Sequence, residues 1–153
     1  MEADVTVRAA RPEDAERLVD FNLRLARETE DRALDVGVLT CGLNAILADA
    51  SRGFYLVAEI GGQIAGCLMV TFEWSDWRNG TFWWIQSVYV PHEYRRRGVF
   101  RALYDDVRRR AKNSENVCGC RLYVERDNTP AQATYMRMGF CETGYKVLEE
   151  VFE

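Results

Sequence analysis

A run of arginines around a glycine follows an apolar, strand-like stretch in the middle of the chain. The run is Arg95-Arg96-Arg97-Gly98, and Arg101 follows inside a helix predicted from about Arg97 to Lys112. Unpaired N–H groups at a helix start carry about half a positive charge, which neighbouring guanidinium groups reinforce. This segment is therefore a candidate pyrophosphate site, although an arginine run taken alone is more often a solvated basic face.

A second candidate region is a predicted β-hairpin rich in tryptophan. Asn79-Gly80 is the preferred dipeptide of a two-residue type I′ turn, and counting outward from it places Glu73 opposite Gln86. Trp74 and Trp84 belong to the same hairpin. They could line a pocket, but cross-strand packing is the commoner role of aromatic residues in sheets.

The composition limits what these candidates can do. The chain has 153 residues, 48% of them hydrophobic, which predicts one globular domain over residues 1–153. Its net charge of −4 disfavours a general nucleic-acid binder. The acidic start, Met1 to Asp4, lacks a signal-peptide pattern, and no apolar run approaches the ~18 residues that span a bilayer. We expect a cytoplasmic protein with no nucleic-acid or membrane partner.

Metal and redox sites are not predicted. The five cysteines lack paired disulfide or zinc spacing, and Cys118-Gly119-Cys120 is more typical of one face of a strand than of a metal pair. The one histidine, His92, follows Pro91 in a turn-like stretch, so no Ser/His/Asp triad is available. We expect free thiols and no metal.

Periodicity and turn residues predict an α/β protein with one mixed sheet of six to seven strands and helices on both faces. The predicted strands span residues 5–8, 54–60, 63–72, 74–78, 81–90, 118–125 and 140–151; the predicted helices start at 11, span 36–50 and 97–112, and run from 129 to about 138. The strands over 81–90 and 118–125, called strands four and five below, flank the 97–112 helix. They should be parallel because a right-handed crossover joins them.

Two segments of the sequence resemble the GNAT superfamily of N-acetyltransferases. Arg95 and Gly98 match its acetyl-CoA-binding motif, Q/R-x-x-G-x-G/A after a strand, while Phe100 departs from the small residue usual at the last position. The stretch from Asn128 to Phe140, with Tyr135 in its helix and a closing Gly-Phe, resembles the second signature. The resemblance extends over almost the whole chain and implies a mostly antiparallel sheet whose parallel strands four and five splay apart.

The resemblance implies acetyl-CoA as the cofactor and assigns residues to it. Backbone amides from Arg96 to Arg101 would hold the pyrophosphate, and strand four would hydrogen-bond the pantetheine arm. Asn128 would either contact the cofactor or cap its helix, and Tyr135 would protonate the departing thiolate. The full set is Val88, Tyr89, Val90, Arg95, Arg96, Arg97, Gly98, Val99, Phe100, Arg101, Asn128 and Tyr135.

The acceptor is expected to be an amine, which needs help to lose its proton at neutral pH. Glu73 is the first candidate for that base, followed by Asp76 and Glu125, with ordinary surface acids as the alternative. The family places its acceptor partly under the segment that here is acidic, and acids beside tryptophans suit a cation. The predicted acceptor-binding residues are Glu28, Glu30, Asp31, Trp74, Asp76, Trp84 and Gln86.

These inferences predict transfer of an acetyl group from acetyl-CoA to a primary amine, of a cationic small molecule, by direct attack in a ternary complex without an enzyme nucleophile. Two alternatives stay open. One is acetylation of protein lysines or N-termini, and the other is a non-catalytic acyl-CoA-binding sensor on the same fold. A homodimer is also compatible with the sequence.

Overall fold

The computed structural model describes residues 4–153 and divides them into two compact units, one ending at Leu122 and one beginning at Tyr123. Residues 1–3, most of the acidic start, lie outside the described part. No helix within that part is long and apolar enough to cross a membrane.

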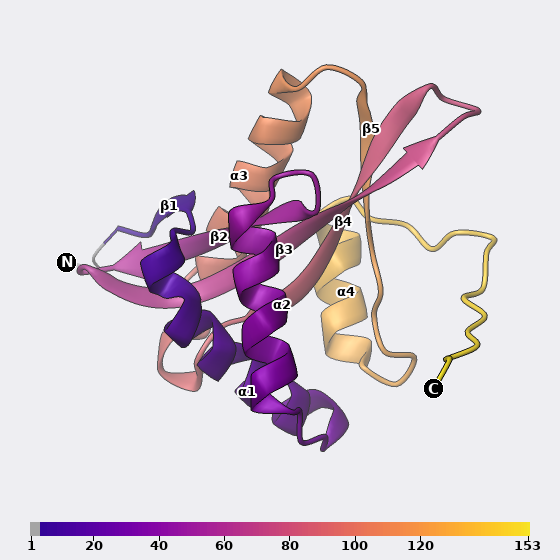
Figure 1. The fold of residues 1–153 in the computed structure, drawn as a ribbon. Coiled ribbons are helices and arrows are strands. Elements are labelled where there is room, and N and C mark those ends of the chain that lie inside the picture. The colour runs from indigo at the N-terminus through magenta and orange to yellow at the C-terminus, as the bar shows by residue number, and fades with distance from the viewer. Residues whose placement is uncertain (1–3) are drawn as a thin grey trace. The chain divides into compact units, whose positions relative to one another are not determined.

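The first unit is built on one twisted five-stranded sheet (Figure 1). Its strands, in spatial and chain order, are β1 (Thr6–Ala9), β2 (Gly53–Ile60), β3 (Gln63–Ser75), β4 (Gly80–Tyr89) and β5 (Val117–Leu122). The first four are antiparallel neighbours, whereas β4 and β5 are parallel. The mixed sheet with a parallel fourth and fifth strand is confirmed; the expected six to seven strands are not, because the described residues form five.

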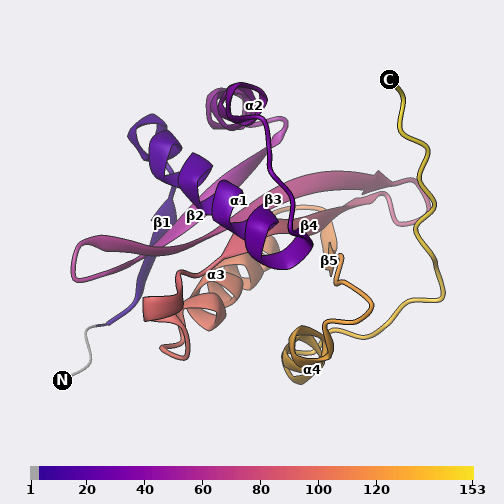
Figure 2. The same cartoon turned by 90° about the horizontal axis from the view of Figure 1, so that it is seen from below.

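Helices cover both faces of this sheet, as Figure 2 shows in a view along it. A short 3-10 turn (Pro12–Asp14), α1 (Ala15–Glu30) and α2 (Val36–Ala48) lie on one face, and α3 (Val99–Asn113) lies on the other. The buried stripe of α1 includes Leu18 and Phe21, which pack with Tyr55, Cys67 and Tyr89 of the sheet. This apolar cluster fixes α1 over the end of β4.

The β3–β4 hairpin closes with a longer turn than the sequence predicts. Ser75 pairs with Gly80, so four residues, 76–79, form the loop, with Asn79 in the left-handed region at φ 43°. The Asn79 amide donates to the Asp76 carbonyl (3.2 Å), as in the type I turns on which four-residue loops are built. Glu73 therefore lies opposite Phe82 instead of Gln86, and the predicted register is wrong.

An extra residue interrupts β4 near its end. Cys67 pairs with Tyr89 and Met69 with Gln86, so β4 advances three residues where β3 advances two. Ser87 sits within this bulge at φ 50°. Because side chains normally alternate between faces, the bulge lets Gln86 and Tyr89 point to the same face, toward α1.

Close approach of α3 to the sheet depends on Gly66 in β3. A Cβ atom added there would lie 2.7 Å from Val99 Cγ1 and 3.1 Å from the Tyr89 carbonyl oxygen. Val99, Leu103 and Val107 are almost completely buried along α3. The missing side chain thus allows the first turn of α3 to rest directly on the sheet.

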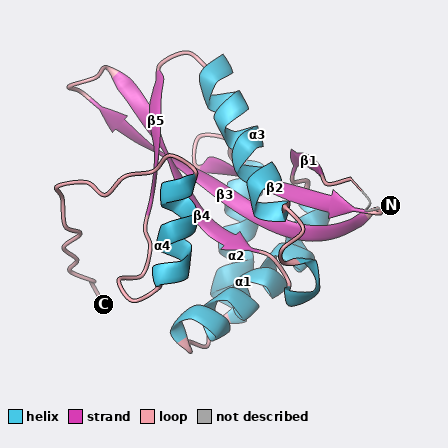
Figure 3. Cartoon of the chain, turned by 180° about the vertical axis from the view of Figure 1, so that it is seen from behind, coloured by secondary structure: helices cyan, strands magenta, loops and turns pink. Residues whose placement is uncertain are grey.

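The second unit contains one helix, α4 (Thr129–Arg137). The strand predicted over 140–151 is absent: residues 140–153 form neither helix nor strand, and Figure 3 draws them as loop. Apolar side chains in this segment are exposed, Leu148 by 91%. An alternating pattern predicts a strand only where a neighbouring strand can satisfy its backbone, and the described residues form no ladder there.

Replacing Gly66 tests how tightly α3 is seated. We expect Gly66→Ala to lower the free energy of unfolding by about 1–3 kcal/mol through overpacking against Val99. Gly42→Ala, in α2, is the matched control because its Cβ would meet nothing within 4 Å. It should instead stabilise the helix by about 0.5–1 kcal/mol. Urea titration measures both, and equal effects at the two glycines would contradict the close approach.

Candidate functional site

The loop between β4 and α3 has the backbone geometry of an anion site. Arg96 is left-handed at φ 62° and Gly98 at φ 76°, whereas Arg97 between them is not in that region. Residues that alternate in hand turn successive N–H groups inward and form a concave anion-binding nest. Gly98 also caps α3, whose first turn presents further N–H groups without intrahelical acceptors.

Three arginines, Arg96, Arg97 and Arg101, belong to this nest and the first turn of α3. Arg96, with His92 and Arg95, lines an open pocket of about 560 Å³. The Arg97 guanidinium lies 5.6 Å from the centre of the Tyr94 ring, and Arg101, which is 71% exposed, lies 3.8 Å from Asp105. These positive groups and the helix N-terminus together favour a multiply charged anion.

The Arg95 side chain is instead hydrogen-bonded to α1 and to the residue that follows β4. Its Nε donates to the Val90 carbonyl (2.8 Å) and its Nη2 to Glu28 Oε2 (2.7 Å), while the guanidinium lies 5.9 Å from the Tyr89 ring centre. Glu28, predicted to bind the acceptor, therefore lies with the anion loop. Burial opposes its ionisation, but the hydrogen bonds from Tyr89 and Arg95 outweigh this effect and lower the pKa of its carboxyl group.

Phe100, the departure from the motif, does not fill the nest with its ring. The ring stacks on Tyr104, one turn further along α3, with centroids 6.3 Å apart and planes at 14°. By contrast, a Cβ added at Gly98 would meet nothing within 4 Å, so the space in front of that backbone is open. The bulky residue is thus compatible with an anion held by main-chain N–H groups.

The end of β4 separates from β5. The last pair between these strands is Ile85 with Leu122, and β4 continues to Tyr89 without a further β5 partner among residues 4–153. From Gln86 onward, that edge of β4 forms no ladder with β5, and an extended ligand can add to a strand edge of this kind. Val88 and Val90, the residues expected to bind such a ligand, lie in this stretch and directly after it.

Glu73 belongs to a polar cluster on the sheet face that α1 and α2 share. Its Oε1 accepts hydrogen bonds from Trp84 Nε1 (3.1 Å) and Arg121 Nη1 (2.7 Å). The Arg121 guanidinium also lies 3.7 Å from the centre of the Phe82 ring. Gln86, further along β4, donates to Thr71 Oγ1 (2.5 Å). The structure therefore brings Glu73 and Trp84 together, whereas Gln86 pairs with Met69, four residues before Glu73 in β3, and is not the neighbour of Glu73 that the predicted register required.

Sequence reasoning missed Arg121 in this cluster. It lies in β5, directly opposite Trp84 in the parallel ladder. The signal was present, because parallel pairing of residues 81–90 with the next strand brings some β5 side chain beside Trp84. Its register could not be counted across a helical crossover.

Other predicted acceptor residues are not brought to this cluster. Trp74 is 67% exposed and points to the opposite face, the one on which Phe72 packs against Trp83 with ring centres 6.0 Å apart. Asp76 lies in the hairpin loop, where its carboxylate accepts from the Trp77 amide. Glu30 ends α1, and Asp31 lies 3.4 Å from Arg27 of the same helix.

In the second unit, Asn128 caps α4. Its side-chain oxygen accepts from the Ala131 amide (3.2 Å), so the capping role is present. Tyr135 packs edge-on against Phe140 with ring centres 5.9 Å apart, and burial raises the pKa of its phenol. This tyrosine therefore stays protonated throughout the neutral pH range.

Burial makes two of the thiols poor nucleophiles. All five cysteines are free, as predicted, and Cys67 is fully buried in the sheet. Burial raises the pKa of Cys67 to about 12 and also raises that of Cys120. A reactive cysteine needs the opposite shift.

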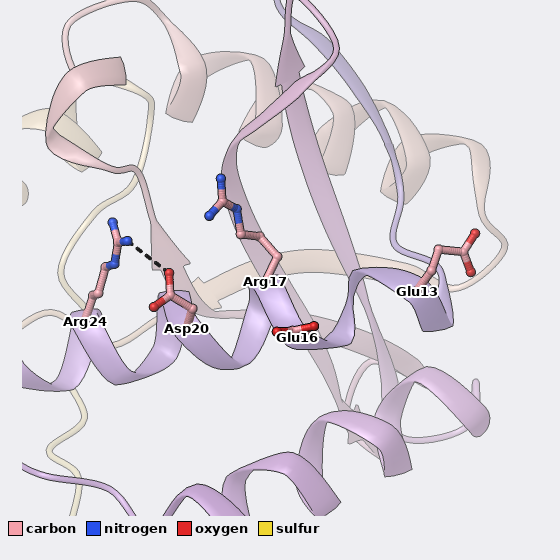
Figure 4. Close-up of a pocket in the computed structure, with 5 residues that line it drawn as sticks. All are labelled: Glu13, Glu16, Arg17, Asp20 and Arg24. Carbon is pink, nitrogen blue, oxygen red and sulfur yellow. Dashed lines mark ion pairs between the residues drawn. The ribbon is translucent and has the colours of Figure 1, made fainter.

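A second open pocket, of about 520 Å³, runs along α1 (Figure 4). Its lining holds three acidic and two basic side chains, and Asp20 lies 3.1 Å from Arg24. The lining residues are Glu13, Glu16, Arg17, Asp20 and Arg24. Asp20 and Arg24 are an i,i+4 ion pair, and a helix surface of mixed charge is typical of a solvated face.

A family model described as the acetyltransferase (GNAT) family matches residues 17–140. The chain is 44% identical to a possible acetyltransferase from Clostridium difficile 630, with a TM-score of 0.91 over 97% of this chain and 99% of that one. None of the curated proteins matches the sequence significantly.

More distant solved structures share the fold. A predicted acetyltransferase from Clostridium acetobutylicum, solved with acetyl-CoA, is 22% identical, with a TM-score of 0.78 over 96% of both chains. An integron cassette protein from the Cole Harbour Salt Marsh metagenome is 20% identical, with a TM-score of 0.83 over 96% of this chain and 90% of that one. At this level of identity the likeness concerns the fold alone.

Gly98 tests the left-handed nest. Because its Cβ would meet no atom, Gly98→Ala should destabilise the protein only through its backbone, by about 1–2 kcal/mol. Asn tolerates the left-handed region, so Gly98→Asn should cost clearly less. Chemical denaturation of both variants measures the difference. Equal stability of the Ala variant and the wild type would mean that residue 98 does not need a positive φ.

Proposed function

Because the chain belongs to the acetyltransferase (GNAT) family, we propose that it transfers the acetyl group of acetyl-CoA to a primary amine. The observation that carries this proposal is the loop before α3, where Arg96 and Gly98 form an anion-binding nest at the helix N-terminus. A short segment, residues 90–95, joins that nest to the end of β4, where β4 forms no further ladder with its parallel neighbour. A phosphate group and an extended amide-bearing arm, joined in one ligand, match these two features.

The residues fit acetyl-CoA. Main-chain N–H groups of Arg96 to Arg101 would hold the pyrophosphate, with the side chains of Arg96, Arg97 and Arg101 adding positive charge. The open space in front of Gly98 supports close approach of an anion. The edge of β4 near Val88 and Val90 would bind the pantetheine amides. When bound, acetyl-CoA supplies an activated thioester whose sulfur leaves as a thiolate when the amine takes the acetyl group.

Tyr135 is the proposed proton donor. Its phenol O–H gives a proton to the departing sulfur and regains one from solvent afterwards. A thiol has a pKa of about 8.5 and a phenol about 10, and burial raises the pKa of Tyr135 further, so the donor is protonated when needed. Asn128 would support this residue indirectly by capping the helix that carries it.

Glu73 is the proposed acceptor of the amine proton. Holding a lysine-like amine neutral at pH 7 costs roughly 4.6 kcal/mol, so a carboxylate near the attacking nitrogen is useful. Hydrogen bonds from Trp84 and Arg121 orient the Glu73 side chain through Oε1, and Oε2 is the oxygen assigned to the proton. Asp76, in the hairpin loop, is a weaker choice.

The acceptor class follows from the charges that remain. Glu28 is bonded to Arg95 and Glu73 to Arg121, and Asp31 lies 3.4 Å from Arg27, so Glu30 is the predicted acid that most supports a cationic small molecule. A protein lysine or N-terminus is the alternative acceptor, and a non-catalytic acyl-CoA sensor is the alternative class. We further propose that residues 1–153 act as one domain, since the family model extends into both units.

Turnover by a Tyr135 variant tests the enzyme. We expect Tyr135→Phe to lower kcat by about 10²-fold, the lower range for a lost general acid, with little change in acetyl-CoA affinity. CoA release is measured against polyamines, aminoglycosides, amino acids and lysine peptides. Tyr145→Phe, at an exposed position, is the matched control. Acetyl-CoA binding without turnover of any acceptor would favour the sensor.

A pH series tests the base. Glu73→Gln should reduce kcat/KM for the amine by about 10²-fold at pH 7. The deficit should shrink as pH rises toward 9.5, because the neutral fraction of an amine with a pKa of about 10.4 grows about tenfold per pH unit. Glu115→Gln, an exposed carboxylate, serves as control. A deficit independent of pH would assign Glu73 a structural role.

A further inference from the structure

Glu28 joins helix α1 to both sides of the segment that leads into the anion loop. Its Oε1 accepts from the Tyr89 hydroxyl (2.8 Å), and its Oε2 accepts from Arg95 Nη2 (2.7 Å). Tyr89 is the last residue of β4, and Arg95 is the first arginine of the loop. One carboxylate therefore ties together the two ends of residues 89–95.

Arg95 also makes two hydrogen bonds to residues inside the same segment. Its Nε donates to the Val90 carbonyl (2.8 Å), while its backbone amide donates to the His92 carbonyl (3.2 Å). The guanidinium also lies over the Tyr89 ring, 5.9 Å from its centre. With Val90 and Glu28 as partners, the Arg95 side chain is bound on the strand side of the loop, before the nest begins at Arg96.

The helical end of this connection is rigid. Glu28 lies in the last turn of α1, and Phe21 of the same helix packs on the Tyr89 ring at 5.3 Å between centres. Tyr89 itself is 4% exposed. The carboxylate is therefore presented from a helix already fixed to β4 by apolar contact, which limits how far the loop can move.

From this geometry we infer that Glu28 is a positioning residue for the pyrophosphate loop and that Arg95 binds the cofactor indirectly, by fixing the loop backbone. The inference rests on the proposed cofactor. It assigns Glu28 to the cofactor side of the reaction instead of the acceptor side. It also assigns Arg95 to the loop's architecture, leaving the phosphate charge to Arg96, Arg97 and Arg101.

Two competing assignments predict different effects on CoA binding and on the KM for the amine. If Arg95 were a phosphate ligand restrained by Glu28, then removing the Glu28 charge would release it and tighten CoA binding. If Glu28 were an acceptor ligand, its loss would raise the KM for the amine alone. Under our inference, loss of Glu28 weakens CoA binding and leaves the KM for the amine nearly unchanged.

Calorimetric titration with CoA and with acetyl-CoA distinguishes these assignments. We expect Glu28→Gln and Arg95→Met each to raise Kd by about five- to tenfold, the scale of a half-exposed ion pair that orders a loop. The double variant should be no more than about twofold weaker than either single one, because the two side chains act as a unit. Glu16→Gln removes an exposed carboxylate from the same helix and should bind CoA like the wild type.

Hydrogen exchange in the free protein gives a readout that needs neither CoA nor turnover. Amides of residues 90–98 should exchange faster in Glu28→Gln, and to a smaller extent in Tyr89→Phe, which loses only the hydroxyl. Amides of α3 beyond its first turn should be unchanged, which separates a local effect from general loss of stability. Tighter or unchanged CoA binding in Glu28→Gln, or unchanged exchange of the loop, would overturn the inference. Failure of the wild type to turn over any amine would sink only the proposed transfer reaction.

Discussion

The single extra residue in β4 is the constraint on which the rest of the site depends. With the bulge at Ser87, Gln86 and Tyr89 both face α1; in a regular strand, an odd separation would put them on opposite faces. Tyr89 can then pack on Phe21 and reach Glu28. In the same stretch β4 leaves its parallel neighbour. The strand thus changes from a ladder member into a support for the loop that follows.

Two further conditions make that loop an anion site, and both concern the backbone. Gly66 allows the first turn of α3 to approach the sheet, which determines where its N–H groups lie. The left-handed conformations of Arg96 and Gly98 allow the N–H groups of this loop to point inward as in an anion-binding nest. The positive charge of the arginine side chains is secondary to this backbone geometry. Arg95 is an example, because its side chain is bound to Glu28 and to the Val90 carbonyl on the strand side of the loop.

Much of this arrangement could be predicted from local sequence. Glycines, prolines and apolar periodicity located every helix to within a few residues, and the arginine run was correctly interpreted as the start of a helix. The hairpin register failed because Asn79-Gly80 favours a two-residue turn in isolation, whereas the protein forms a four-residue loop over 76–79 closed by a hydrogen bond from Asn79 to Asp76. Contacts between elements distant in the chain, such as Glu28 with Arg95 or Glu73 with Arg121, have no local signal. The strand expected over 140–151 failed for a related reason, because a strand exists only with a partner.

The released edge of β4 also bears on how copies of the protein behave toward one another. A row of backbone donors and acceptors without a β5 partner is a template to which a strand from another chain can add, the usual starting point of edge-to-edge aggregation. In the proposed complex, the amides of the pantetheine arm occupy this edge. The ligand would then serve as a protective cover for the strand as well as a source of acetyl groups, so the cofactor-free protein is the form most exposed to self-association.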